Sequence, residues 1–309
     1  MRASPLRQRL LGNPVSRTLL SLWAWLMIGV VVIVWVPLTF IVFVFTAPFD
    51  KGRYRAGWMF RRLCVVHTWL NPLWSFRTSG LEVKDPRRPY VVVANHQSTA
   101  DPWLLSSLRW DMRWIAKASL FRAPVIGWLM RLGGDLEVVR GQGASVKAML
   151  AEARATLARG MSLMIFPEGT RSPDGELGRF KDGAFELAIA SGAPILPVVV
   201  DGTHHCRPKG SWWFGEADAV AKVLPPIATE GLTMADVPAL REQVRATIAS
   251  ELVRLRNAPL PPVAALIAPD MALPAAVAAA MLTAASAAPR PTSASTESGA
   301  RGDDMGEHE

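Results

Sequence analysis

The chain has 309 residues, of which 50% are hydrophobic and 19% charged, and its net charge is +8. This much apolar material excludes intrinsic disorder for the bulk of the chain and indicates that part of it meets lipid. The excess of Lys and Arg favours an anionic partner, such as a phosphorylated substrate, nucleic acid or a membrane surface. Cys64 and Cys206 are the only cysteines. Two cysteines exclude a disulfide framework and a four-cysteine zinc site, and they favour a reducing compartment.

A long uncharged segment lies near the N-terminus. Residues 18–49 contain no charged side chain, and a spanning helix needs only about 20 apolar residues. The apolar part of a cleaved signal peptide is shorter, about 7–15 residues, so we predict an uncleaved, helical membrane anchor. Both flanks are basic, so the distribution of positive charge gives no orientation. A single tilted span and a re-entrant hairpin bent at Pro37 both fit.

A second helical pattern follows the anchor. Apolar residues recur at helical spacing over residues 58–76, and Arg61 and Arg62 lie among them. A core helix has a similar pattern, but tryptophan together with arginine is typical of a helix at the membrane interface. We therefore assign residues 1–76 to a membrane-anchoring segment that contains the apolar stretch at residues 18–49 and this interfacial helix.

Strand and helix patterns alternate after Arg77. Short apolar runs predict buried strands at the following positions: Tyr90–Ala94, Leu136–Val139, Ser162–Phe166 and Ile195–Val200. With the helical patterns between and after them, they predict an α/β domain over residues 77–257. Because these strands lie beyond residue 50, we expect the domain to fold without residues 1–50. Residues 258–309 are rich in Ala, Pro and Ser, which predicts a mostly disordered tail.

A histidine and an aspartate follow the first of these strands. His96 comes directly after Asn95, and Asp101 lies five residues further on. A short turn can bring Asp101 back to the imidazole, and a carboxylate that holds one tautomer is what a general base requires. No Ser or Cys here has to be the nucleophile, so the base can act on a substrate hydroxyl. The alternative is an Asp that caps the next helix beside an incidental His.

The segment Phe166–Ser172, of sequence FPEGTRS, also follows a strand. Gly169 lets backbone amides turn toward an anion, and Arg171 can bind a phosphate through two hydrogen bonds. Glu168 can orient Arg171 or a substrate hydroxyl. The alternative is an ordinary turn with a surface arginine.

Other polar groups are less specific. Arg140 ends a third strand, and further cations lie nearby in sequence: Lys117, Arg179 and Lys181. Each also fits an ordinary surface charge. The run His204-His205-Cys206, with Asp201, matches no standard zinc spacing, so we expect no metal site. No recognition motif or basic helix argues for nucleic acid binding.

Together these segments resemble the glycerolipid acyltransferase family that includes the 1-acyl-glycerol-3-phosphate acyltransferases. Asn95–Asp101 matches the H-x-x-x-x-D block of the family, and Phe166–Ser172 matches its third block. Gly134–Arg140 and Ile195–Val198 resemble the second and fourth blocks, although the residues before the final arginine of the second block differ from those usual in the family. The resemblance covers about residues 75–230.

The resemblance implies a mixed sheet flanked by helices, as in glycerol-3-phosphate acyltransferase. It also implies acyl transfer from acyl-CoA or acyl-carrier protein to the free hydroxyl of 1-acyl-glycerol-3-phosphate, which gives phosphatidic acid. His96 and Asp101 are then the catalytic residues. The implied substrate-binding residues are Arg140, Glu168, Gly169, Thr170, Arg171 and Pro197, and the last of these helps to shape the acyl site. No metal or prosthetic group is needed, and the cytosolic acyl donors place the catalytic domain at the cytoplasmic face of the inner membrane.

Two alternatives stay open. One is an acyltransferase with another acceptor, such as glycerol-3-phosphate, a lyso-ornithine lipid or another lysophospholipid, because the four blocks recur with varied acceptors. The other is a non-catalytic membrane protein that binds anionic lipid, in which His96 and Asp101 are incidental. Product analysis with a panel of acceptors separates the three.

Overall fold

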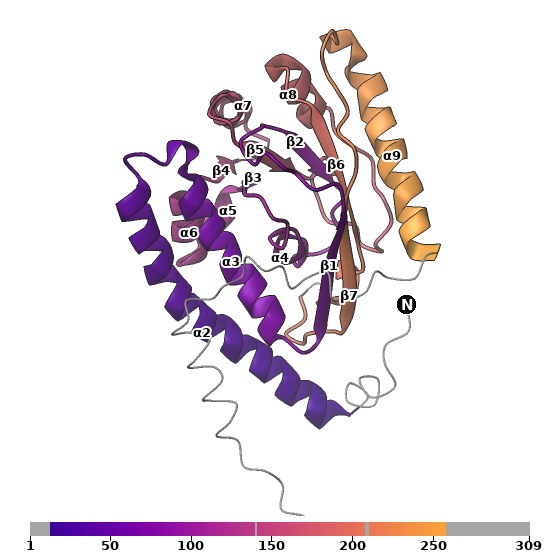
Figure 1. The fold of residues 1–309 in the computed structure, drawn as a ribbon. Coiled ribbons are helices and arrows are strands. Elements are labelled where there is room, and N and C mark those ends of the chain that lie inside the picture. The colour runs from indigo at the N-terminus through magenta and orange to yellow at the C-terminus, as the bar shows by residue number, and fades with distance from the viewer. Residues whose placement is uncertain (1–12, 140, 208–209, 258–309) are drawn as a thin grey trace, which may run out of the picture. The chain divides into compact units, whose positions relative to one another are not determined.

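A mixed sheet of seven strands forms the centre of the molecule (Figure 1). The computed structural model describes residues 13–139, 141–207 and 210–257, which belong to one compact unit. The tail expected over residues 258–309 lies outside them. The strands, in chain order, are β1 (Trp74–Gly80), β2 (Val91–Ala94), β3 (Met112–Lys117), β4 (Leu136–Val138), β5 (Ser162–Ile165), β6 (Ile195–Asp201) and β7 (Ala217–Val223).

The strand order places the carboxyl ends of five parallel strands together. The order is β1-β7-β6-β2-β5-β3-β4, and the strands from β6 to β4 are parallel to one another. Only β7 and β1 run the other way, because β7 pairs antiparallel with β6 and parallel with β1. Parallel strands bring their carboxyl ends to one edge of the sheet. We call this the carboxyl edge; His96 and Phe166 lie just beyond the ends of β2 and β5 there.

Helices cover both faces of the sheet (Figure 1). Their bounds are α2 (Pro14–Thr46), α3 (Tyr54–Leu70), α4 (Asp101–Leu105), α5 (Ala118–Arg122), α6 (Ile126–Gly133), α7 (Gly143–Ala158), α8 (Gly183–Ser191) and α9 (Val237–Asn257). Helices α7, α8 and α9 pack on the face that presents Val91, Val93 and Val199. The opposite face, with Val92 and Val198, packs against α4 and the N-terminal half of α2. Since both faces are covered, β2 is apolar along its whole length and β6 is apolar up to Asp201, its last residue.

Helix α2 is long and apolar enough to cross a membrane, yet it packs along the domain. Ala24 joins the apolar cluster beneath the sheet, and Val31 joins a second cluster with α3, α5 and α6. Halfway along α2, the indole Nε1 of Trp35 donates to the carbonyl of Met59, at 3.0 Å. This packing argues against the expectation that the domain folds without residues 1–50.

The predicted bounds of the helix over residues 58–76 are wrong. It is α3, which ends at Leu70, and the chain then enters β1 at Trp74. The reason is local, because Asn71 precedes a proline and such a residue avoids helical angles; its backbone is extended, and its side-chain oxygen accepts from the amide of Leu73. Most of α3 is packed in the core, and Arg61 is buried. Arg61 therefore belongs to the core, whereas Trp69 near the end of the helix is 65% exposed; an interfacial position for that end of α3 stays a prediction.

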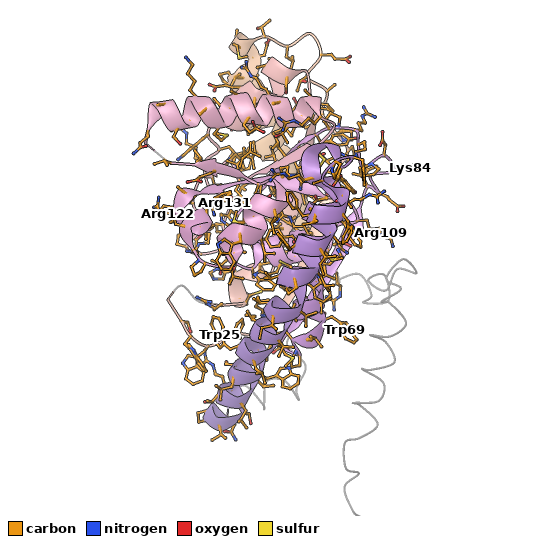
Figure 2. The ribbon with its side chains drawn as sticks, turned by 90° about the vertical axis from the view of Figure 1, so that its left-hand side faces the viewer. Trp25, Trp69, Lys84, Arg109, Arg122 and Arg131 are labelled. Atoms are coloured by element: carbon orange, nitrogen blue, oxygen red, sulfur yellow. The ribbon has the colours of Figure 1, made fainter. Side chains whose placement is uncertain are left out.

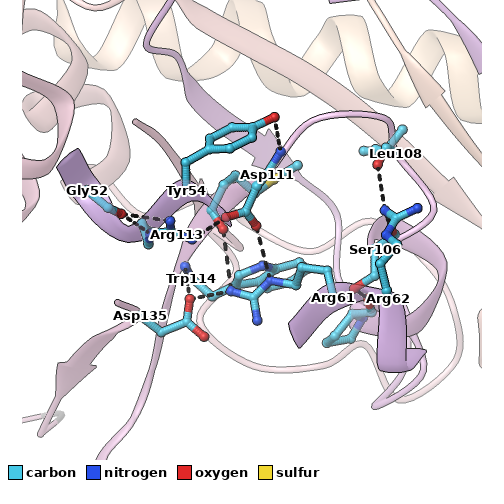
Figure 3. Close-up of polar contacts among 12 residues, drawn as sticks. Gly52, Tyr54, Arg61, Arg62, Ser106, Leu108, Asp111, Arg113, Trp114 and Asp135 are labelled. Carbon is cyan, nitrogen blue, oxygen red and sulfur yellow. Dashed lines mark hydrogen bonds and ion pairs between the residues drawn. The ribbon is translucent and has the colours of Figure 1, made fainter. Parts of the chain in front are cut away.

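A buried polar network explains the arginine on α3 (Figure 3). Arg61 forms ion pairs with Asp111, which precedes β3, and with Asp135, which precedes β4. Arg113 pairs with Asp111 and donates to the carbonyl of Gly52, at 2.8 Å. Gly57 makes room for the network, since a Cβ at that position would lie 2.2 Å from Nη1 of Arg113. The network fastens α3 to the amino ends of β3 and β4.

Candidate active site

The side chains of His96 and Asp101 meet at the carboxyl edge. β2 ends at Ala94, and α4 begins at Asp101, so a short turn brings the two side chains together. Nδ1 of His96 lies 2.6 Å from Oδ2 of Asp101. The imidazole is 19% exposed, whereas the carboxylate is fully buried. When Nδ1–H donates to the carboxylate, Nε2 keeps its lone pair for a substrate proton.

Asp101 is held by more than the histidine. Oδ2 also accepts the backbone amides of Gln97 and Ser98, at 2.8 and 3.0 Å, and Oδ1 accepts the hydroxyl of Thr203. The N-cap position of α4 is occupied by Ala100, so Asp101 does not cap the helix. The carboxylate is instead fixed in the position from which it orients the imidazole.

Two residues of the segment Phe166–Ser172 contact His96 and hold it in place. The ring of Phe166 stacks on that of His96, with centroids 4.0 Å apart and planes inclined by 15°. Glu168 accepts the backbone amides of His96 and Gly178, at 2.7 and 3.0 Å, and its burial raises the pKa of its carboxyl group. Both carboxylate oxygens of Glu168 therefore hold backbone, where the sequence suggested a contact with Arg171 or a substrate hydroxyl.

An open cavity of about 690 Å³ adjoins this turn, and Thr170 and Arg171 line it. The further charged residues in its wall are Arg179, Lys181, Arg241, Glu168, Asp174, Glu176 and Asp182. Arg241 pairs with Asp182 and Glu242, whereas within the described residues the side chains of Arg171, Arg179 and Lys181 form no ion pair. Gly169 has a φ of +71°, and a Cβ there would lie 2.8 Å from Nζ of Lys181. A turn of this shape with three cations is suited to an anion such as a phosphate.

The cavity and the histidine are linked through the backbone, because the amide of Ser172 donates to the carbonyl of His96, at 2.8 Å. Pro197 does not line this cavity. It is buried in β6, opposite Val93 of β2. Arg140 lies outside the described residues. Lys117 ends β3 at the same carboxyl edge, and its side chain is exposed.

Sequence reasoning missed several residues that build the site. The side chain of Asn95 donates to the carbonyl of Val200 and accepts its amide, at 2.7 and 2.8 Å, which extends the pairing of β2 with β6. Gln97 donates to the carbonyl of Gly175, at 3.2 Å. The position of Asn95 next to His96 was a signal that it belongs to the site. Thr203 gave no such signal, because it lies 102 residues from Asp101 in the chain. Among the described residues, no group of His, Cys, Asp and Glu could hold a metal ion.

The chain is similar to known proteins. Residues 75–201 match a family model described as Acyltransferase. The chain is 35% identical over 199 residues to 1-acyl-sn-glycerol-3-phosphate acyltransferase alpha of Homo sapiens, which covers 63% of this chain and 70% of that protein. The chain belongs to this acyltransferase family. The matched residues include both members of the His96–Asp101 pair and the whole of the third block.

Two further family members extend the comparison. The chloroplastic 1-acyl-sn-glycerol-3-phosphate acyltransferase BAT2 of Brassica napus is 35% identical over 187 residues, or 60% of this chain. The chain spans 54% of the length of that relative. The crystal structure of the 1-acyl-sn-glycerophosphate acyltransferase PlsC from Thermotoga maritima aligns with a TM-score of 0.65 and 26% identity, over 80% of this chain and 99% of that one. The expected fold, a mixed α/β sheet flanked by helices, is thereby confirmed.

Proposed function

We propose that this chain transfers a fatty acyl group from acyl-CoA or acyl-carrier protein to the free hydroxyl of 1-acyl-glycerol-3-phosphate and so forms phosphatidic acid. The observation that carries the proposal is the pair His96–Asp101, hydrogen-bonded at 2.6 Å beside a cavity whose wall includes Arg171, Arg179 and Lys181. The relatives named as 1-acyl-sn-glycerol-3-phosphate acyltransferases support the choice of acceptor.

In the proposed reaction the acceptor hydroxyl gives its proton to Nε2 of His96 while its oxygen attacks the thioester carbonyl. The new C–O ester bond forms, the C–S bond breaks, and the proton passes from the imidazolium to the leaving thiolate. Asp101 keeps the imidazole oriented and stabilises its charged form. Arg171, Arg179 and Lys181 bind the acceptor phosphate. The roles of Arg140 in phosphate binding and of Pro197 in shaping the acyl site stay predictions.

The proposed acceptor is a membrane lipid, and α2 offers the means of contact. Its buried residues run from Ser21 to Thr39 on the side that packs against the domain, so a transmembrane path for α2 would draw the domain into the bilayer. Large apolar side chains on the other side of α2 are exposed, among them Leu26, Ile33 and Phe45. We therefore favour a helix that lies along the cytoplasmic surface of the membrane over both a tilted span and a hairpin.

The test is lipid extraction after incubation of the purified protein with a labelled acyl donor and a panel of acceptors. We expect label in phosphatidic acid, and a loss of about 10²–10⁴-fold in turnover for His96→Ala. His205→Ala, at an exposed histidine in the turn that follows β6, is the matched control and should keep full turnover. Label in the product of glycerol-3-phosphate, lyso-ornithine lipid or another lysophospholipid, or unchanged turnover in His96→Ala, would contradict the proposal.

A further inference from the structure

A loop between β6 and β7 joins the carboxyl edge to α2. It is Ser211–Phe214, which we call the tryptophan loop. The indole Nε1 of Trp25 on α2 donates to the carbonyl of Trp212, at 3.1 Å, and the amide of Phe214 donates to the hydroxyl of Ser21, also at 3.1 Å. The loop is therefore fixed against the N-terminal half of α2, on which Figure 2 shows Trp25.

Aromatic rings and arginines are in contact where the tryptophan loop meets α2. The rings of Trp25 and Phe214 meet edge to face, 5.3 Å apart. The guanidinium of Arg17 lies 5.6 Å from the ring of Trp213, and that of Arg207 lies 5.6 Å from the ring of Trp25. Trp212, at the tip of the loop, is 45% exposed. Exposed indoles beside arginines are typical of the interface between a membrane and water, where the ring is half solvated and the cation meets a phosphate.

A second element at the carboxyl edge has the same composition. Helices α5 and α6 follow β3, and they expose Leu120 and Trp128, the latter by 57%. Arg122 and Arg131 lie on these helices (Figure 2), and Arg131 lines a cavity with Val36 and Phe40 of α2. Exposed apolar side chains are much rarer on α9, which covers the other face of the sheet. Among the described residues of α9, Val253 is the one large apolar side chain that is exposed.

We propose that the membrane-contacting surface extends from α2 onto the tryptophan loop and the α5–α6 turn. Both elements start at strands that end at the carboxyl edge, so this contact places the edge that carries His96 against the lipid headgroups. The proposal rests on the proposed function only in taking the bilayer as the source of the acceptor. The partner of this surface is the interfacial layer of a phospholipid bilayer. The exposed apolar residues of α2 form part of the same surface, and the arginines complement the negative charge of lipid phosphates.

The test uses an environment-sensitive fluorophore on single cysteines of the full chain. Burial raises the pKa of Cys64 to about 11 and raises that of Cys206 as well, so both native thiols react slowly near neutral pH. Trp212→Cys and Trp128→Cys report the proposed contacts. Ile33→Cys, 73% exposed on α2, reports the anchor, and Val253→Cys, 58% exposed on α9, is the matched control.

The labelled variants are mixed with vesicles of phosphatidylcholine and phosphatidylglycerol, with and without bromine on the acyl chains. We expect a shift of emission to shorter wavelength and quenching by bromine at positions 212, 128 and 33, and neither at position 253. If position 33 responds while 212 and 128 behave like 253, the proposal is overturned. Acyl transfer measured in detergent micelles tests the proposed function separately, since a protein without transfer activity can still bury position 212.

Discussion

Asp101 is the residue on which the geometry of the site depends most, because its carboxylate accepts four hydrogen bonds while fully buried. Asp101→Asn keeps the shape but replaces one acceptor oxygen with an NH₂ donor. We expect turnover to fall about 10²–10⁴-fold, because the imidazole loses its preferred tautomer. Thr203→Val removes one donor and leaves the His96 contact in place, so its loss should be much smaller. Equal turnover of Asp101→Asn and the unmodified protein would show that the carboxylate is only structural.

Arg171 tests the binding half of the site. Arg171→Ala removes a charge-assisted contact worth about 1.5–3 kcal/mol, so we expect KM for the phosphate-bearing acceptor to rise about tenfold to a hundredfold. Turnover at saturation should change little, since the contact is equally strong in the ground and transition states. Arg159→Ala is the control, because Arg159 lies beyond the end of α7 and pairs with Glu152 at the surface. A rise in KM for the acyl donor instead would move Arg171 to the donor site.

The sequence was sufficient to predict the pair His96–Asp101, because both members lie within one short turn after an apolar strand. It was not sufficient to predict what holds them. Besides His96, the donors to Asp101 are two backbone amides and the hydroxyl of Thr203. Every residue except proline has a backbone amide, so the residue type does not reveal which amides donate. The role of Glu168 was open for the same reason, since its partners are the amides of His96 and Gly178.

At the scale of elements, His67 makes the contact between α2 and α3 sensitive to pH. Its Nε2 lies 3.3 Å from the carbonyl of Ala24, and burial lowers its pKa to about 4. An unfolded histidine titrates near 6.5, so between pH 6.5 and 4 the unfolded chain binds more protons than the folded one. Stability is therefore complete above about pH 6.5 and falls as the pH drops toward 4, by up to about 3 kcal/mol.

His67→Gln keeps a side-chain amide donor and removes the titration. We expect urea unfolding to show a shallower loss of stability from pH 6.5 to 4 in this variant than in the unmodified protein. His205→Gln, at an exposed position, should leave the slope unchanged. Parallel curves for His67→Gln and the unmodified protein would place the acid sensitivity elsewhere.

The strands differ in how readily they could be predicted. β2, β5 and β6 are covered on both faces, so their sequences are nearly continuous apolar runs. β1 was missed because it is an edge strand with the polar sequence WSFRTSG. β3 was missed because its buried Arg113 interrupts the apolar pattern. That arginine pairs with Asp111 and donates to the carbonyl of Gly52, which lies 61 residues away in the chain. The same network explains why the burial of Arg61 on α3 was not predicted, since a buried arginine and an interfacial one look alike in sequence.

At the scale of the molecule, α2 is part of the fold as well as the proposed membrane contact. Removal of residues 1–50 would uncover Phe60, Leu63 and Leu129, which pack with α2 in one apolar cluster. Burial of each large apolar side chain contributes about 1.5–3 kcal/mol, so we expect a loss on the order of 10 kcal/mol, comparable to the whole stability of a domain. Circular dichroism and thermal unfolding in detergent should show loss of the cooperative transition.

Removal of residues 1–12 is the matched control, because it leaves α2 whole, and this variant should unfold like the full chain. A truncated protein that lacks residues 1–50 and still unfolds cooperatively near the same temperature would restore the independent domain that the sequence pattern suggested.

The pairing of β1 with β7 has a consequence for the order of events on the ribosome. Trp74 is opposite Ala217, so this edge of the sheet cannot close until roughly 140 further residues have been made, which takes on the order of 10–30 s at the usual rate of translation. During that time α2 has emerged, but the tryptophan loop that it packs against has not yet been synthesised. The nascent chain must therefore hold a long apolar helix without its final partner. Early capture of that helix by the membrane surface, ahead of domain closure, would keep the growing chain from aggregating.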